Sequence, residues 1–175
     1  SFMWFLINKY LKKSASAFSD NSKKQLTIIE LFQSVSYQTQ MGQMLDLLSQ
    51  PQGSKDSKLL NTFNIDVYNR IVTFKTAIYT FYLPIAVGMI LCGYDSPKQL
   101  ALAREISIEL GKKFQIEDDY LDCYGLPEKI GKNGTDIKDH KCSWLVVQAL
   151  QRVTPDQRAI LDSNYGKDEK ANEEA

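Results

Sequence analysis

Residues 114–122 read Phe-Gln-Ile-Glu-Asp-Asp-Tyr-Leu-Asp, and this acidic stretch decides how the rest of the chain is interpreted. On a helix, Asp118 and Asp122 lie one turn apart on one face, and Asp119 is about 100° round from Asp118. Aspartate is a poor helix former and neighbouring carboxylates repel, so folding alone does not favour this sequence. Mg²⁺ prefers oxygen ligands and typically combines one or two carboxylates with phosphate oxygens. The motif therefore predicts a magnesium–diphosphate site, and a solvated acidic helix face is the alternative.

Outside the acidic stretch, apolar residues recur at helical spacing along most of the chain. The helix that carries the motif is expected over 97–123, because Ser96 and Pro97 form a typical helix start. We expect further helices over residues 1–13, 28–48, 58–63, 66–92, 143–152 and 155–164, loops over 14–24 and 125–141, and a frayed tail over 167–175. No paired strands are indicated, so the pattern predicts an all-α fold of antiparallel helices.

An uncharged run over residues 77–94 is close to the length that crosses a bilayer. The run contains Pro84 and Gly88 as well as hydroxyl groups, and Lys75 stands just before it. These features favour a buried core helix over a transmembrane helix, and we expect no membrane span. Since the proline ring removes a backbone donor, we also expect a kink near Pro84.

The bulk composition argues against several classes of protein. The 175 residues carry no formal net charge, and 43% of them are hydrophobic and 24% charged, as in ordinary soluble globular proteins. Without a basic excess we expect no nucleic-acid partner. Cys92, Cys123 and Cys142 show no CxxC spacing, which indicates reduced thiols in a cytoplasmic protein, and His140 has no ligand partners nearby in the sequence. Residues 1–7 lack the basic region of a signal peptide.

Other polar residues are candidates to join the aspartates in one site. The loop over 131–141 contributes lysines, flexible glycines and Asp136, and lysine ammonium groups act as point charges for phosphate. Lys75 enters an apolar helix, where it either snorkels to the surface or faces a polar cavity. Gln43 and Asp46 lie one turn apart on another predicted helix. Taken singly, each feature has a simpler alternative: a basic surface loop, a snorkelling lysine, or exposed spacers between core residues.

Five blocks of sequence, in this order along the chain, closely resemble the eukaryotic farnesyl diphosphate synthases. The blocks are Tyr37-Gln38-Thr39 with Gly42-Gln43 and Leu45-Asp46-Leu47, Lys75-Thr76-Ala77 with Tyr79 and Phe81-Tyr82-Leu83-Pro84, the acidic stretch over 114–122, Gly131-Lys132 with Gly134-Thr135-Asp136-Ile137, and His140-Lys141-Cys142-Ser143-Trp144. The resemblance covers about residues 28–166 and is weak over 1–27. It implies an all-α antiparallel bundle of the isoprenoid synthase type around a deep cavity. Residues 1–175 would then form a single partial domain, truncated at both ends.

The resemblance also implies an activity, a cofactor and partners. Members of this family are prenyltransferases of isoprenoid biosynthesis, and they join an allylic diphosphate, dimethylallyl or geranyl, to isopentenyl diphosphate. The products are geranyl and farnesyl diphosphate. The implied cofactor is Mg²⁺, which with the lysines stabilises the departing diphosphate, while an apolar cavity protects the allylic cation from water. A homodimer in the cytoplasm is expected for the full-length protein.

Individual residues match functional positions of this family. The matching catalytic positions are Lys75, Thr76 and Gln115, of which the last two would lie near the developing carbocation. Carboxylates that match the metal site are Asp118, Asp119, Asp122, Asp46 and Asp136, with Asp118 expected to be the direct ligand. Positions that match substrate-binding residues are Lys75, Lys132, Gln43, Tyr79 and Lys141.

The chain departs from the family pattern in one major respect. Asp118-Asp119 is the only adjacent aspartate pair in the chain, so the first aspartate-rich motif of the family is absent. The arginines that follow that motif are absent too, and Glu117 stands where relatives commonly carry glutamine. We therefore expect a fragment of a farnesyl diphosphate synthase that is inactive by itself. The alternatives are a catalytically incomplete diphosphate-binding or regulatory paralogue, and a terpene cyclase or longer-chain prenyltransferase on the same fold.

Overall fold

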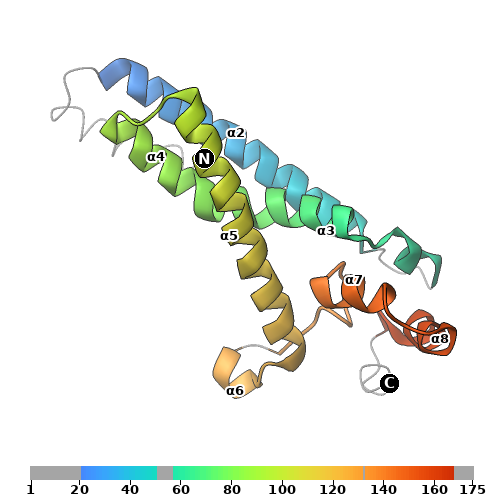
Figure 1. Cartoon of the computed structure of the whole chain (residues 1–175). Coiled ribbons are helices and arrows are strands. Elements are labelled where there is room, and N and C mark those ends of the chain that lie inside the picture. The colour runs from blue at the N-terminus through green and yellow to red at the C-terminus, as the bar shows by residue number, and fades with distance from the viewer. Residues whose placement is uncertain (1–20, 51–56, 132, 168–175) are drawn as a thin grey trace.

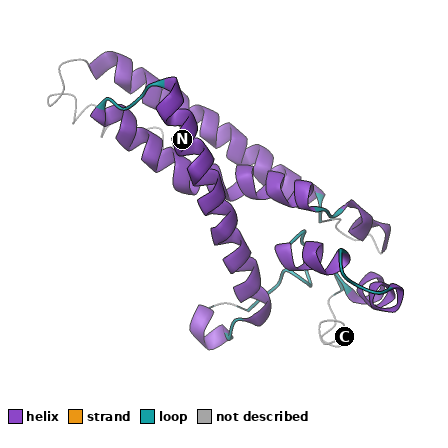
Figure 2. Cartoon of the chain, in the orientation of Figure 1, coloured by secondary structure: helices purple, strands orange, loops and turns teal. Residues whose placement is uncertain are grey.

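The described part of the chain consists of packed helices and the loops that join them (Figures 1 and 2). A computed structural model describes residues 21–50, 57–131 and 133–167, and no strand occurs in those ranges. The elements in chain order are α2 (Asn21–Leu48), η2 (Ser57–Thr62), α3 (Ile65–Val72), η3 (Thr73–Tyr82), α4 (Leu83–Cys92), α5 (Pro97–Tyr124), α6 (Pro127–Ile130), α7 (Trp144–Leu150) and α8 (Pro155–Asn164). The predicted all-α class is confirmed. The helix expected over 1–13 and most of the expected tail lie outside the described residues.

Three long helical segments form the main body of the molecule. In Figure 1, α2 runs alongside α3 and α4 in the opposite chain direction, and α5 crosses them obliquely. At one end of this body, α7 packs against α3 and α5, and α8 packs against η2. The second half of α5 and the segment that follows it therefore lie near α3.

A single continuous helix runs from Ile65 to Cys92, but its central part, Thr73–Tyr82, is a π-helix. We predicted a kink near Pro84, whereas the departure from α-helical geometry begins at Thr73 and ends before the proline. A π-helical turn holds more residues than an α-helical turn, and such turns are frequent at functional sites. This one carries Lys75 and Thr76, two of the predicted site residues.

Two glycines allow α2 and α5 to approach this π-helix closely. A Cβ atom at Gly42 would lie 2.3 Å from the backbone nitrogen of Lys75, and one at Gly111 would lie 2.2 Å from the Cβ of Ala77. Both distances are far below any allowed contact, so no side chain fits at either position. The helices on both sides of η3 therefore set where its residues stand.

The segment Ile65–Cys92 is the one described helix that is long and apolar enough to span a membrane by length and composition. Its side chains at Ala77, Ile78, Ala86 and Ile90 are at most 1% exposed. Helices α2 and α5 both pack against this helix. This packing favours the predicted core helix.

Two apolar clusters hold the described helices together. One joins η2, α3 and α7, and its buried members are Leu60, Phe63, Tyr68, Ile71, Val72, Cys142, Val146 and Val147. The other joins α2 to η3 and α4, and its buried members are Val35, Ile78, Tyr82 and Ala86. Because the first cluster includes Cys142 and α7, it holds the end of the loop over 131–141 beside α3.

The predicted helix boundaries are close to the observed ones, with two corrections. Helix α2 begins at Asn21, inside the stretch over 14–24 that we predicted to be a loop. The short α6, Pro127–Ile130, lies inside the predicted loop over 125–141, where a single turn is too short to show periodicity. The predicted helix starts at residues 97 and 155 are confirmed, since the side chains of Ser96 and Thr154 just before them each accept a hydrogen bond from a backbone N–H three residues further on.

Candidate functional site

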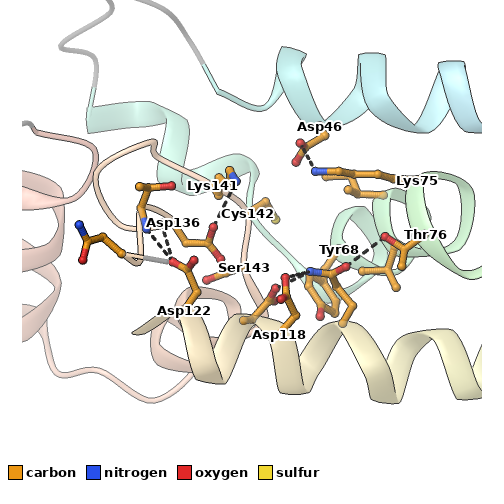
Figure 3. Close-up of a pocket in the computed structure, with 16 residues that line it drawn as sticks. Asp46, Tyr68, Lys75, Thr76, Asp118, Asp122, Asp136, Lys141, Cys142 and Ser143 are labelled. Atoms are coloured by element: carbon orange, nitrogen blue, oxygen red, sulfur yellow. Dashed lines mark hydrogen bonds and ion pairs between the residues drawn. The ribbon is translucent and has the colours of Figure 1, made fainter. Parts of the chain in front are cut away.

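Side chains from α2, α3, η3, α5 and the loop that precedes α7 line one cavity of about 220 Å³ (Figure 3). The predicted site residues that meet there are Asp46, Lys75, Thr76, Gln115, Asp118, Asp119, Asp122, Asp136 and Lys141. They come from positions up to 95 residues apart in the chain, since Asp46 and Lys141 both belong to the set. The fold thus gathers most of the predicted site into one place.

Three predicted residues do not belong to this cavity as described. Gln43 is exposed on α2, and Tyr79 on η3 is 49% exposed. Neither side chain lines the cavity. Lys132 lies outside the described residues. The roles in substrate binding that we expected for these residues stay predictions.

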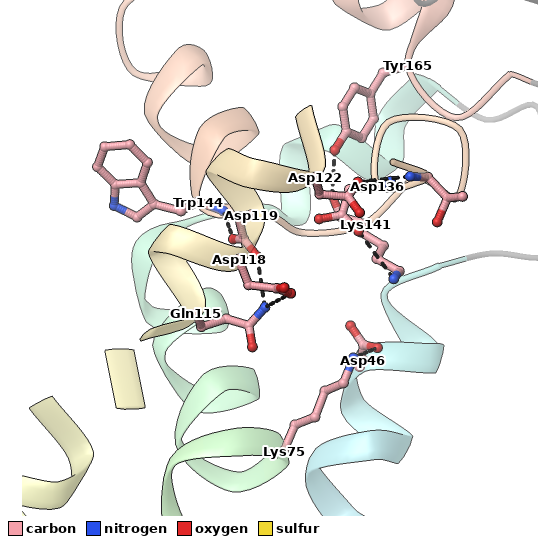
Figure 4. A network of polar contacts seen from close by, with 11 residues as sticks. Asp46, Lys75, Gln115, Asp118, Asp119, Asp122, Asp136, Lys141, Trp144 and Tyr165 are labelled. Atoms are coloured by element: carbon pink, nitrogen blue, oxygen red, sulfur yellow. Dashed lines mark hydrogen bonds and ion pairs between the residues drawn. The ribbon is translucent and has the colours of Figure 1, made fainter. Parts of the chain in front are cut away.

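Asp119 is the most deeply buried of the three aspartates of the acidic stretch, with 4% of its surface exposed. Its Oδ1 accepts a hydrogen bond of 2.9 Å from Gln115 Nε2, and its Oδ2 accepts one of 2.7 Å from the backbone N–H of Trp144 (Figure 4). Burial raises the pKa of this carboxyl above its usual range, although both hydrogen bonds lower it. Asp119 thereby ties α5 to the start of α7.

Asp122 fixes the loop that follows α5. Its Oδ2 accepts hydrogen bonds from the backbone N–H groups of Thr135, at 2.8 Å, and Asp136, at 2.9 Å. The loop comes so close that a Cβ at Gly134 would lie 1.8 Å from the backbone oxygen of Asp122. A carboxylate at 122 and a glycine at 134 therefore act together to place Asp136 in the cavity wall.

Gln115 connects the acidic stretch to the π-helix. Its Nε2 donates hydrogen bonds to Asp119 and, at 3.2 Å, to Asp118, while its Oε1 accepts one of 3.0 Å from the Thr76 hydroxyl. Thr76 is 7% exposed, and Gln115 and Asp118 are half-buried. These three polar groups form a continuous line along the cavity wall.

Two ion pairs add lysine ammonium groups to the site. Lys75 Nζ lies 2.5 Å from Oδ2 of the buried Asp46, and this pair connects η3 to α2. Lys141 Nζ lies 3.2 Å from Asp136 Oδ1 within the loop segment. The cavity therefore presents carboxylates and cations side by side (Figure 4).

The charges of the loop residues perturb one another. Burial and the negative charge of Asp122 raise the pKa of Asp136 to about 6, although Lys141 opposes the shift. Burial alone would lower the pKa of Lys141, but the nearby carboxylates of Asp136 and Asp46 outweigh it, and the pKa of Lys141 is raised. The lysine therefore stays charged, and an additional cation beside Asp136 would favour the charged form of its carboxyl.

The donor set of the cavity is compatible with Mg²⁺ bound together with a phosphate ligand. Among residues 21–50, 57–131 and 133–167, no three Asp, Glu, His or Cys side chains form a preformed metal cluster. Mg²⁺ does not need one, because it usually binds one or two carboxylates and takes its remaining ligands from phosphate and water. Asp118 reaches the cavity from α5, opposite the Asp46–Lys75 pair. These oxygens fit a shared metal–phosphate site better than an all-protein cage.

Several cavity residues were missed by the sequence analysis. They are Tyr68, Ile71, Val72, Asn133, Thr135, Cys142 and Ser143. One signal was available for Tyr68, because Tyr68, Val72 and Thr76 follow one another at four-residue intervals on one helix face. Burial raises the pKa of the Tyr68 hydroxyl, and the charge of Asp119 beside it adds to the rise.

Comparison with known proteins gives one consistent family. The sequence profile of the polyprenyl synthetase family matches residues 1–175. The chain is 46% identical over 163 residues to farnesyl pyrophosphate synthase of Saccharomyces cerevisiae, with 93% of this chain and 46% of the yeast protein covered. It is 56% identical over 144 residues to the Homo sapiens protein of that name, with 82% and 34% covered. The chain thus spans about half the length of the curated relatives it matches, or less.

Solved structures agree with this similarity. A farnesyl pyrophosphate synthase structure from T. brucei, in complex with a chlorobenzothiophene acetic acid, superposes with a TM-score of 0.79 at 35% sequence identity. That superposition covers 89% of this chain and 46% of the T. brucei chain. A T. brucei farnesyl diphosphate synthase complexed with risedronate gives a TM-score of 0.78 at 32% identity, with 93% and 48% covered. The helices of this chain are therefore arranged like those in about half of each matched enzyme chain.

Proposed function

The chain belongs to the polyprenyl synthetase family, and on this premise we propose that it forms the diphosphate-binding side of a farnesyl-diphosphate-synthase-type prenyltransferase. The proposed reaction joins dimethylallyl or geranyl diphosphate to isopentenyl diphosphate and yields geranyl and then farnesyl diphosphate. The observation that carries the proposal is the cavity in which α5 carboxylates face two lysines from other segments. In the full-length protein we further propose a cytoplasmic homodimer without a membrane span.

The carboxylates of the cavity would hold the cation that accompanies the diphosphate. Bound Mg²⁺ would supply positive charge to the phosphate oxygens and so ease departure of the leaving group. Asp118 is the proposed direct ligand, because it is half-buried at the cavity wall, whereas Asp119 and Asp122 each hold a backbone N–H of another segment. Asp46 and Asp136 would support this site from α2 and the loop.

The lysines would bind the diphosphate and hold it during departure. Lys75 and Lys141 are already positioned by Asp46 and Asp136, so they need little reorganisation to contact phosphate oxygens. Lys132 is proposed as a third such lysine on the resemblance alone. Gln43 and Tyr79 remain proposed substrate-binding residues, and they would contact parts of the substrate beyond the described cavity.

Thr76 and Gln115 are the proposed catalytic groups near the allylic carbon. Their hydrogen bond places two oxygen atoms at the cavity wall, between the lysine of η3 and the carboxylates of α5. Oxygen lone pairs stabilise a developing cation without forming a bond to it. Lys75 completes the proposed catalytic set as a diphosphate contact.

A protein that binds diphosphate without turnover is the second candidate, because Asp118-Asp119 is the only adjacent aspartate pair in the sequence. The test is an assay of the full-length protein that contains this chain, supplied with Mg²⁺, dimethylallyl diphosphate and isopentenyl diphosphate, followed by chromatography of the products. The proposal predicts farnesyl diphosphate. Mg²⁺-dependent binding without any product would contradict it and favour the second candidate, and a cyclic or longer product would indicate a different member of the fold.

A further inference from the structure

The hydrogen bonds that run from α5 through Gln115 to Thr76 on η3 have only one chemically consistent set of donors and acceptors. Carboxylates of Asp118 and Asp119 only accept hydrogen bonds, so the side chain of Gln115 must present its NH₂ group to them. Its carbonyl oxygen then points the other way, where it accepts the hydrogen of the Thr76 hydroxyl. Only one orientation of the Gln115 amide satisfies all these partners.

Asp119 is the partner that keeps this orientation when a ligand binds. Asp118 is the proposed metal ligand, and a cation would draw its carboxylate away from Gln115. Asp119 is 4% exposed and is held on its other oxygen by the backbone N–H of Trp144 at 2.7 Å. Both of its oxygens are thus held by protein donors in a buried site, which fixes the direction of the carboxylate toward Gln115 and Trp144.

We propose that Asp119 is a positioning residue and not a metal ligand: it fixes the Gln115 amide so that Gln115 and Thr76 offer the cavity only oxygen lone pairs. Because the Thr76 hydrogen is donated to Gln115, neither group directs a hydrogen-bond donor at a ligand. A wall of this kind favours positive charge, which is the charge that develops on the allylic group. The catalytic part of this inference rests on the proposed prenyltransferase function.

The near-isosteric variant Asp119→Asn tests the inference because position 119 would then donate a hydrogen bond to Gln115, where the wild-type carboxylate accepts one. The carbonyl of the new amide at position 119 would accept from Trp144, and its NH₂ group would face Gln115. Gln115 would then rotate, offer its oxygen to that NH₂ group and present its own NH₂ group to Thr76 and the cavity. In the full-length enzyme kcat should fall about a hundredfold, with little change in KM for the allylic diphosphate or in the Mg²⁺ requirement.

A second variant separates positioning from a purely structural role. In Asp119→Asn/Gln115→Glu the carboxylate and the amide exchange places, so the new carboxylate at position 115 accepts from both the amide at position 119 and Thr76. Lone pairs then face the cavity again, and Mg²⁺ bound at Asp118 offsets the repulsion between the carboxylates at positions 115 and 118. The inference predicts that kcat recovers at least about tenfold over Asp119→Asn. It is overturned if Asp119→Asn keeps the normal kcat, if excess Mg²⁺ restores the rate of Asp119→Asn, or if the double variant is no faster than the single one.

The amide orientation can also be measured without any turnover. In ¹⁵N-labelled protein, nuclear Overhauser effects should place the Gln115 NH₂ protons near the Asp118 and Asp119 side chains in the wild type. In Asp119→Asn they should lie near the Thr76 methyl group once Mg²⁺ and inorganic pyrophosphate are bound and Asp118 no longer holds the Gln115 amide. Wild-type NH₂ protons near Thr76 would overturn the inference even if the variant failed to fold. This result is independent of the proposed function, which fails instead if the wild-type full-length enzyme makes no prenyl product.

Discussion

The three aspartates of the acidic stretch have three different environments, although they lie within five residues of one another. Asp118 is half-buried and contacts Gln115 at the cavity wall. Asp119 is buried and binds the start of α7. Asp122 binds the backbone of the loop over 131–141. Substitutions at these positions should therefore differ in kind as well as in size.

Replacing Asp122 with alanine should loosen the loop. Its Oδ2 is the acceptor for the backbone N–H groups of Thr135 and Asp136, and both would lose a charge-assisted hydrogen bond. We expect a local destabilisation of about 1–3 kcal/mol. Hydrogen exchange at these two amides should accelerate accordingly, whereas Asp95→Ala, in the exposed turn between α4 and α5, should leave them unchanged. Unchanged exchange in Asp122→Ala would argue against the anchoring role.

The raised pKa of Asp136 predicts a pH-dependent stability. Burial and Asp122 raise its pKa to about 6, so the folded state holds the proton more tightly than the unfolded state does. The contribution of Asp136 to stability should therefore fall as the pH rises from about 4 to about 6, and the loss should be complete above that range. Asp136→Asn does not titrate and avoids this loss.

Urea unfolding of wild type and Asp136→Asn measures this effect. At about pH 4 the two proteins should have similar free energies of unfolding. At about pH 7.5 the free energy of unfolding of the variant should exceed that of the wild type by on the order of 1–2 kcal/mol, a value reduced for the partial exposure of Asp136. A difference that does not change with pH, or that changes in the opposite direction, would show that the ion pair with Lys141 dominates instead.

Some site residues could be predicted from the sequence and others could not. The positions of Lys75, Thr76, Gln115 and Asp118 follow from their motifs and meet in the cavity. The separate roles of Asp119 and its neighbours depend on hydrogen bonds to backbone groups 13 to 25 residues further along the chain. Helical spacing says nothing about such contacts, because they depend on how a loop returns to the helix.

At the level of elements, the π-helix Thr73–Tyr82 is the feature that the sequence did not reveal. Its wider turns change the spacing of residues on one face, but ten residues are too few to distinguish this spacing from that of an α-helix. The sequence instead pointed to Pro84, which lies beyond the end of the π-helix. The pattern of the neighbours is informative in retrospect: Gly42 on α2 and Gly111 on α5 stand where the π-helix is approached most closely. The longer helices were predictable from apolar residues at helical spacing or from capping residues, whereas the single turn of α6 was not.

Gly42→Ala should be strongly destabilising, because its Cβ would meet backbone atoms of Phe74 and Lys75 that have no room to move. We expect a loss of about 1–3 kcal/mol or more in the free energy of unfolding. The matched control is Gly88→Ala in α4, where no atom lies within 4 Å of the new Cβ. Since glycine is unfavourable in a helix interior, the free energy of unfolding of the Gly88→Ala control should increase by about 0.5–1 kcal/mol. Equal effects of the two substitutions in urea unfolding would contradict the close packing of α2 on η3.

On the scale of the whole molecule, the fold class was predictable and the cavity was not. Helical periodicity and the absence of strand signals suffice to predict an all-α chain. The cavity requires α2, η3, α5 and a loop to converge, and this depends on tertiary packing at glycines and on loop anchoring. Only the resemblance to a family indicated in advance that these distant residues would share a site.

The chain alone should bind its ligand without completing the reaction. It spans about half the length of its curated relatives and has one adjacent aspartate pair, so we expect it to supply only part of the metal ligands that the family resemblance implies. We expect no farnesyl diphosphate from residues 1–175 supplied with Mg²⁺ and both substrates. Product formed by this chain, detected by chromatography, would show that the remaining ligands are unnecessary.

The central claim is that Asp118 and the facing lysines form a Mg²⁺-dependent diphosphate site, and calorimetric titration with inorganic pyrophosphate tests it most directly. Binding should appear only with Mg²⁺ present, and Asp118→Asn should weaken it about tenfold or more, while Asp95→Asn leaves it unchanged. Pyrophosphate binding that is equally strong without Mg²⁺, or in Asp118→Asn, would contradict the account.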